Sequence, residues 1–192
     1  MKKDGSMIIL ASASPRRRDL LARENVPFTV HTAEVEEASS GMTPEELVCA
    51  NAAAKAEAVA ARFPEAMVLG ADTVVAHRGR ILGKPSSPAE AQAMLQSLAG
   101  ETHHVITGVA LCRRNDAFLT TFAEVTEVVF RPFDDAVIRQ YLSLVNVLDK
   151  AGAYALQEYG EMLVQSVAGD PDNVVGLPVR RVVQTLRELG EI

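Results

Sequence analysis

The sequence contains little cysteine. Cys49 and Cys112 are its two cysteines, and neither lies in a Cys-x-x-Cys pattern or at a cysteine–histidine spacing that is typical of zinc sites. Two isolated cysteines favour free thiols in a reducing compartment. The sequence therefore argues against a disulfide-stabilised secreted domain and a structural zinc module.

Long hydrophobic runs are also absent. No apolar run reaches the roughly 18 residues that a membrane-spanning helix requires, and residues 1–6 lack the hydrophobic segment of a secretory signal. We therefore expect a cytoplasmic protein that does not enter a membrane. We expect residues 1–6 to be an unstructured extension and residues 7–192 to form a single domain.

Positive charge is not in excess. The chain has 19 Lys and Arg against 25 Asp and Glu, which gives a net charge of −6. Such a balance argues against a nucleic-acid polymer as partner, since phosphate neutralisation needs a basic surface. A small anionic substrate stays open, because it needs only a local basic pocket.

Several common catalytic motifs are missing. The chain has no GxxxxGK[ST] phosphate loop, no GxGxxG fingerprint, no HExxH helix and no GxSxG elbow. Kinase, dehydrogenase, zinc-protease and esterase functions therefore lose their usual sequence support.

Strand patterns and helix patterns intermingle along the whole chain, which predicts an α/β fold with a mixed sheet and flanking helices. The expected strands are residues 7–11, 28–31, 67–71, 74–76, 80–82, 104–112, 118–130 and 162–167. The expected helices start at Pro15, at two capping boxes (Thr43 to Glu46 and Ser87 to Glu90), near Asp134 and at Pro178.

A basic cluster, Ser14-Pro15-Arg16-Arg17-Arg18, opens the first expected helix. Arginines are unfavourable at the positive end of a helix dipole, but a bound anion turns that cost into a gain. A solvated basic face explains any single arginine better. For the whole cluster, directly after a strand, phosphate binding is the preferred interpretation.

Acidic residues offer a possible metal or base. Asp72 follows an apolar run at what reads as the carboxyl end of a strand, where α/β sheets place ligand sites. It can act as a general base or metal ligand, or it can cap a turn. Glu34, Glu36 and Glu37 form an acidic loop that can join Asp72 around magnesium or remain solvated.

Three further polar residues have open roles. Lys55 lies among alanines and either enters a pocket or extends along a packed helix. Lys84, in Gly83-Lys84-Pro85, either binds phosphate or stays in solvent. Gln157 either reads a base edge or is a surface glutamine. By contrast, His103 and His104 point to opposite faces of a strand, so structural roles are favoured over a shared metal.

The ordered set of motifs resembles the Maf family from residue 7 to the C-terminus. The matching segments are Leu10-Ala11-Ser12-Ala13-Ser14-Pro15-Arg16-Arg17, Gly70-Ala71-Asp72-Thr73-Val74-Val75, Gly83-Lys84-Pro85, His103 to Gly108, Gly152-Ala153-Tyr154 with Gln157, and Asn173-Val174-Val175-Gly176-Leu177-Pro178. The resemblance implies a Maf/inosine-triphosphatase-like fold with two lobes around a cleft, and a homodimer. It also implies magnesium- or manganese-dependent hydrolysis of a nucleoside triphosphate to monophosphate and pyrophosphate.

The resemblance also implies residue roles. Asp72 matches the catalytic proton acceptor, and Glu37 matches a loop acid that would share the metal with it. The positions that match substrate-binding residues are Ser12, Ser14, Arg16, Arg17, Lys55, Thr73, Lys84 and Gln157. Among these, Arg16, Thr73 and Gln157 match positions that separate the subfamily acting on dTTP and UTP from the one acting on 7-methyl-GTP.

Two segments depart from the family pattern. Glu158-Tyr159-Gly160-Glu161 stands where many members have a glycine-rich turn, and Gly169-Asp170-Pro171-Asp172-Asn173 differs from the commoner Gly-Asp-Tyr pattern. We expect a pyrophosphatase for dTTP, UTP and modified pyrimidine nucleotides. The alternatives are a pyrophosphatase for 7-methyl-GTP or other modified nucleotides, and a septum-formation regulator that acts by partner binding.

Overall fold

The computed structural model describes residues 8–39 and 41–192, so the extension expected at residues 1–6 lies outside the described residues. The strands are β1 (Ile8–Leu10), β2 (Phe28–Val30), β3 (Val68–His77), β4 (Arg80–Leu82), β5 (Thr102–Arg113), β6 (Phe118–Phe130) and β7 (Val164–Ala168). The α-helices are α1 (Pro15–Arg23), α2 (Pro44–Ala60), α3 (Pro88–Leu98), α4 (Asp135–Leu144), α5 (Pro171–Val175) and α6 (Val179–Glu188). Two short 3₁₀ helices are η1 (Ala151–Ala153) and η2 (Gly160–Met162).

The strands form one mixed sheet in the order β2-β1-β3-β5-β6-β7, with β4 paired to β3. β1 runs parallel to both β2 and β3, whereas β4 is antiparallel to β3 and β7 is antiparallel to β6. The predicted α/β fold with a mixed sheet is therefore confirmed. No helix in the described part of the chain combines the length and apolar character of a membrane span.

The chain divides into two compact units. The first consists of the residues up to Asp72, Thr107–Glu124 and Gly176–Ile192. The second consists of Thr73–Ile106 and Val125–Val175, so β3, β5 and β6 contribute residues to both units. The single domain and the cleft expected from the resemblance stay predictions.

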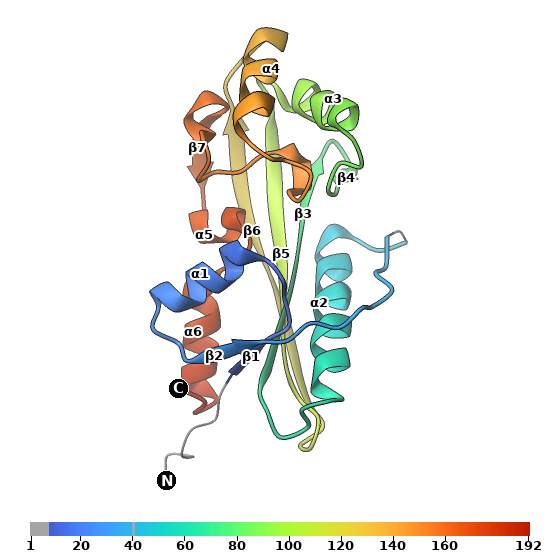
Figure 1. The fold of residues 1–192 in the computed structure, drawn as a ribbon, viewed down its shortest axis with the longest axis vertical. Coiled ribbons are helices and arrows are strands. Elements are labelled where there is room, and N and C mark those ends of the chain that lie inside the picture. Colours follow the sequence, from blue (N-terminus) through green and yellow to red (C-terminus); the bar gives the residue numbers. More distant parts are fainter. Residues whose placement is uncertain (1–7, 40) are drawn as a thin grey trace. The chain divides into compact units, whose positions relative to one another are not determined.

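In the first unit, α2 lies directly on the sheet (Figure 1). A Cβ atom at Gly70 of β3 would overlap the carbonyl oxygen of Ala52, and one at Gly108 of β5 would overlap the backbone of Val48. Glycine is needed at both positions because the helix backbone takes the space of a side chain. This close approach brings the polar side chains of α2 to the middle of β3.

In the second unit, α3 and α4 lie side by side over a core that contains large side chains (Figure 1). Phe130 and Tyr141 are almost completely buried there, with Leu95 and Leu98 of α3. The amphipathic patterns of the two helices therefore pack as their sequences predict.

The helix starts match the sequence closely. The capping box at Thr43 is confirmed, because its hydroxyl accepts from the Glu46 N–H and the Glu46 carboxylate accepts from the Thr43 N–H. The second box is half wrong. Ser87 accepts from the Glu90 N–H, but the Glu90 carboxylate accepts from the N–H and hydroxyl of Ser86.

Candidate active site

Asp72 lies inside a strand, so its predicted place at a strand end is wrong. β3 continues from Val68 to His77, because its second half pairs with β4 after the parallel pairing with β1 has stopped at Leu69. β1 is only three residues long, so Asp72 projects beyond the end of its partner strand. The position still leaves the carboxylate at the margin of the β1–β3 ladder, within reach of α1 and α2.

Both carboxylate oxygens of Asp72 have partners from α2. The Lys55 ammonium lies 2.7 Å from Oδ1, and the Asn51 amide donates to Oδ2 at 3.2 Å. The side chains of Asp72 and Lys55 are 13% and 18% exposed, so this ion pair is largely shielded from water. Lys55 therefore reaches Asp72, while its entry into a substrate pocket stays a prediction.

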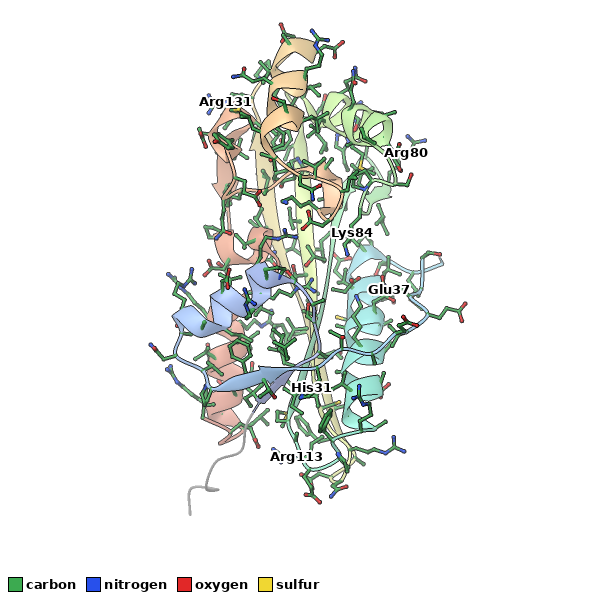
Figure 2. The ribbon with its side chains drawn as sticks, viewed as in Figure 1. His31, Glu37, Arg80, Lys84, Arg113 and Arg131 are labelled. Atoms are coloured by element: carbon green, nitrogen blue, oxygen red, sulfur yellow. The ribbon has the colours of Figure 1, made fainter. Side chains whose placement is uncertain are left out.

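Glu37 binds the same ammonium from the acidic loop. Its Oε1 lies 2.8 Å from the Lys55 Nζ, while about half of its side chain remains exposed. Figure 2 shows Glu37 on the loop beside α2. The cation of Lys55 thus holds two carboxylates together that are 35 positions apart in the sequence.

Arg17 joins three segments of the first unit. Its Nε donates to the Gly176 carbonyl at 2.7 Å, and its Nη1 donates to the Ser12 hydroxyl at 3.1 Å and to the Ala71 carbonyl at 3.0 Å. The guanidinium therefore lies one residue from Asp72 along β3. Burial lowers the pKa of Arg17 to about 10, although the negative charge of Asp72 opposes that shift, so the group stays charged at neutral pH.

The loop before α1 is tightened by a serine. The buried Ser12 hydroxyl accepts from the Ser14 N–H at 3.3 Å, and Ser14 is the N-cap of α1 with Pro15 following it, as predicted. The Ser14 side chain caps none of the described N–H groups of this helix. The half-buried Arg16 lies in the same first turn and lowers the pKa of Arg17 further by charge repulsion.

The remaining predicted residues belong to the second unit. Thr73 follows Asp72 on β3, whereas Lys84 and Gln157 are exposed on loops. Figure 2 shows Lys84 on the loop after β4. That loop is anchored at Gly83, whose carbonyl accepts from the N–H of Gly152 at 3.1 Å.

Glu158, in the turn after Gln157, forms an ion pair with Lys150 that a glycine at this position could not form. Lys150 is 6% exposed, and its ammonium contacts the carboxylates of Asp149 at 3.0 Å and Glu158 at 3.3 Å. A glycine in place of Glu158 would remove one of these contacts. The departure from the glycine-rich pattern thus has a physical reason, since it ties the segment of Gln157 to a buried cation.

The donor chemistry of Asp72 and Glu37 fits a hard divalent cation. Both carboxylates already converge on one cationic group, and carboxylate oxygens are the ligands that magnesium and manganese prefer. No cluster of three or more His, Cys, Asp or Glu side chains arranged for a metal occurs in residues 8–39 and 41–192. Water and phosphate oxygens would therefore have to complete the coordination.

Asn51 is the residue of the site that sequence reasoning missed. It is 4% exposed, and its amide bonds to Asp72 and to the backbone of Ala38. One sequence signal points to it, because Asn51 lies one helical turn before Lys55 in an alanine-rich helix and therefore shares its face. Asparagine is a poor residue for a helix interior, so its presence there calls for a specific partner.

The histidine prediction is confirmed. His103 is fully buried, while about half of the His104 side chain is exposed, as the alternation of a strand requires. The His103 Nε2 lies 2.9 Å from the Tyr154 hydroxyl, and its ring packs edge-on against Phe130. His103 therefore has a structural place in the second unit.

Two named proteins are similar in sequence to this chain along nearly its full length. A dTTP/UTP pyrophosphatase of Akkermansia muciniphila is 52% identical over 186 residues, which cover 95% of this chain and 96% of the relative. A dTTP/UTP pyrophosphatase of Bacillus cereus strain Q1 is 47% identical and covers 95% of each chain.

A solved structure supports the fold. The Staphylococcus aureus Ham1 protein matches with a TM-score of 0.52 over 95% of this chain and 98% of its own, at 17% identity. Similarity at this identity concerns the fold alone. The sequence model of the Maf-like protein family matches residues 7–189, so the chain belongs to that family.

Proposed function

We propose that the protein is a nucleoside triphosphate pyrophosphatase that hydrolyses dTTP and UTP to the monophosphate and pyrophosphate. The observation that carries the proposal is the convergence of the Asp72 and Glu37 carboxylates on Lys55, with Arg17 bonded to the residue before Asp72 on β3. The same activity is named for relatives that are 52% and 47% identical to this chain.

Cationic groups of the first unit would bind the triphosphate. Lys55 and Arg17 lie beside Asp72, and Arg16 lies in the first turn of α1, whose N-terminus favours anions. The hydroxyls of Ser12 and Ser14 lie in the same loop and would add neutral donors. Lys84 is also proposed to bind phosphate as a point charge.

Asp72 would accept the proton of the attacking water. The water oxygen forms a bond to the α-phosphorus, the bond from that phosphorus to the bridging oxygen of the β-phosphate breaks, and pyrophosphate leaves with the electron pair. Lys55 and Asn51 hold the two oxygens of Asp72, so the carboxylate is oriented before substrate arrives. The nearby cations stabilise the charge that grows on the leaving pyrophosphate.

A divalent metal, magnesium or manganese, would be held by Asp72 and Glu37. When bound, such an ion neutralises phosphate charge and makes water more acidic. Glu37 has the exposure that such a ligand needs, since half of its side chain already meets solvent.

Selection of the base is proposed for Arg16, Thr73 and Gln157. Gln157 is exposed, and its amide would offer both an acceptor and a donor to the edge of a uracil-type ring. The expected homodimer and cytoplasmic location remain proposals of the same kind, and sedimentation of the purified protein tests the first of them.

A nucleotide panel tests the function. The protein is incubated with magnesium or manganese and with dTTP, UTP, the other common triphosphates and 7-methyl-GTP, and monophosphate and pyrophosphate are measured. We expect turnover to be highest with dTTP and UTP. Preference for 7-methyl-GTP would support the alternative substrate, and no release from any nucleotide would leave the partner-binding regulator as the surviving alternative.

A further inference from the structure

We infer that Asn51 is a positioning residue that ties the Asp72 carboxylate to the loop carrying Glu37, so that both acids are presented together. The inference rests on the proposed function. It starts from the burial of Asn51, which is 4% exposed on α2. A buried amide destabilises a fold unless its donors and acceptor are paired, so the contacts of this side chain are specific.

The backbone of Ala38 fixes the orientation of the amide. Asn51 Oδ1 accepts from the Ala38 N–H at 2.9 Å, and Nδ2 donates to the Ala38 carbonyl at 3.2 Å. Rotating the amide by half a turn would place like groups against each other at both contacts. Nδ2 is therefore the atom that faces Asp72, and its second hydrogen is donated to Oδ2 at 3.2 Å.

Asn51 and Lys55 therefore form a bracket, in which two side chains from one face of α2 act as its arms and hold both Asp72 and the loop of Glu37. Lys55 contacts the side chains of Asp72 and Glu37, while Asn51, one turn earlier, contacts Asp72 and the residue after Glu37. The ammonium alone would leave the loop free to pivot about Glu37. The paired backbone bonds of Asn51 remove that freedom, which is the kind of preorganisation that catalysis by positioned groups requires.

Two substitutions at Asn51 separate its contact with the Ala38 backbone from its contact with Asp72. Asn51→Leu keeps the approximate volume and removes all three hydrogen bonds. Asn51→Asp keeps an acceptor for the Ala38 N–H but loses the donor to Asp72. The matched control is Asn115→Asp, which makes the same chemical change in an exposed amide that donates to Glu65.

Turnover of dTTP, the KM and the hydrogen-exchange rate of the Ala38 amide are measured for each variant. We expect kcat to fall at least about tenfold in both Asn51 variants with KM changed far less, because misplaced groups slow the chemical step. Exchange at Ala38 should accelerate in Asn51→Leu but stay closer to the wild type in Asn51→Asp. Asn115→Asp should leave all three quantities unchanged.

The outcomes separate this inference from the proposed function. Wild-type kcat in Asn51→Leu, or wild-type exchange of its Ala38 amide, would overturn the positioning role. If Asn51→Leu fails to fold, the kcat of Asn51→Asp decides instead. If the wild type itself turns over no nucleotide, the proposed function fails, while the exchange of Ala38 still decides whether Asn51 holds the loop.

Discussion

Asp72 is the residue whose chemistry the account depends on most. Its two oxygens are held by Lys55 and Asn51, and Lys55 has a second carboxylate partner in Glu37. Replacing Asp72 by asparagine removes the proton acceptor but keeps its shape and one of its two acceptor oxygens. The fold should tolerate the change, because Lys55 still has Glu37 as its counter-ion.

We therefore predict that Asp72→Asn lowers kcat at least about 100-fold, as loss of a general base does, with little change in thermal stability. Steady-state kinetics and a melting curve check both parts. Turnover close to that of the wild type would rule out Asp72 as the proton acceptor.

Arg17 combines a structural role with its proposed contact to phosphate. Its planar guanidinium donates hydrogen bonds to Ser12, Ala71 and Gly176 together, and the ammonium of lysine cannot reproduce this geometry. We predict that Arg17→Lys lowers the free energy of unfolding by about 1–3 kcal/mol, because the carbonyls of Ala71 and Gly176 lose a charged donor.

Urea unfolding of Arg17→Lys measures that loss. Arg18→Lys is the matched control, since Arg18 is one position away and its side chain is 58% exposed. Equal stability of the two variants would contradict a bracing role for Arg17.

At the scale of elements, the position of α2 explains how the site is assembled. The backbone of the helix lies against Gly70 and Gly108, and this contact sets how far Asn51 and Lys55 reach toward β3. We predict that Gly108→Ala lowers the free energy of unfolding by about 1–3 kcal/mol, because the new methyl group overlaps the backbone of Val48 and cannot be relieved by a side-chain rotation.

Chemical denaturation of Gly108→Ala checks this prediction, and Gly83→Ala is the control because the space beside Gly83 is open. If both substitutions had the same small effect, the close approach of α2 to β5 would be wrong.

Element boundaries were predictable where local chemistry defines them. The Thr43 cap and Pro44 fix the start of α2, and the Arg78-Gly79 turn between β3 and β4 fits residues with positive φ. The sequence divided β3 at Asp72 because a polar pair interrupts its apolar pattern. The strand continues because its second half pairs with β4 beyond the last partner on β1. The partners that α2 supplies for the Asp72 carboxylate are a tertiary effect that local patterns do not show.

The sequence predicted which residues belong to the candidate site better than it predicted the contacts between them. The motifs indicated Asp72, Arg17, Lys55 and Glu37, and the structure brings all four together within the first unit. The contact of Asn51 with Asp72 spans 21 positions and depends on helix packing, so no local pattern specified it. The roles of Thr73, Lys84 and Gln157 stay predictions.

At the scale of the whole molecule, buried His103 links stability to pH. Burial lowers its pKa from 6.5 to about 3, with repulsion from His77 and His104 adding to the shift. Below pH 6.5 His103 is therefore protonated in the unfolded chain, whereas in the folded chain it stays neutral until about pH 3. Stability must fall as the pH drops through this window, by up to about 1.4 kcal/mol per pH unit from this group.

We predict that His103→Gln reduces the loss of stability between pH 6.5 and 4.5 by about 2 kcal/mol, because glutamine can still pair with the Tyr154 hydroxyl but does not titrate. Urea unfolding at several pH values measures the slope. His104→Gln, at a half-exposed position, serves as the control. An unchanged slope in His103→Gln would show that other groups carry the acid sensitivity.

The most direct test of the central claim is the fate of the water oxygen. A single turnover of dTTP is run in water enriched in oxygen-18, and the products are analysed by mass spectrometry. The account predicts one labelled oxygen in the monophosphate and none in the pyrophosphate, because water attacks the α-phosphorus. Label in pyrophosphate, or release of orthophosphate with the diphosphate, would contradict it.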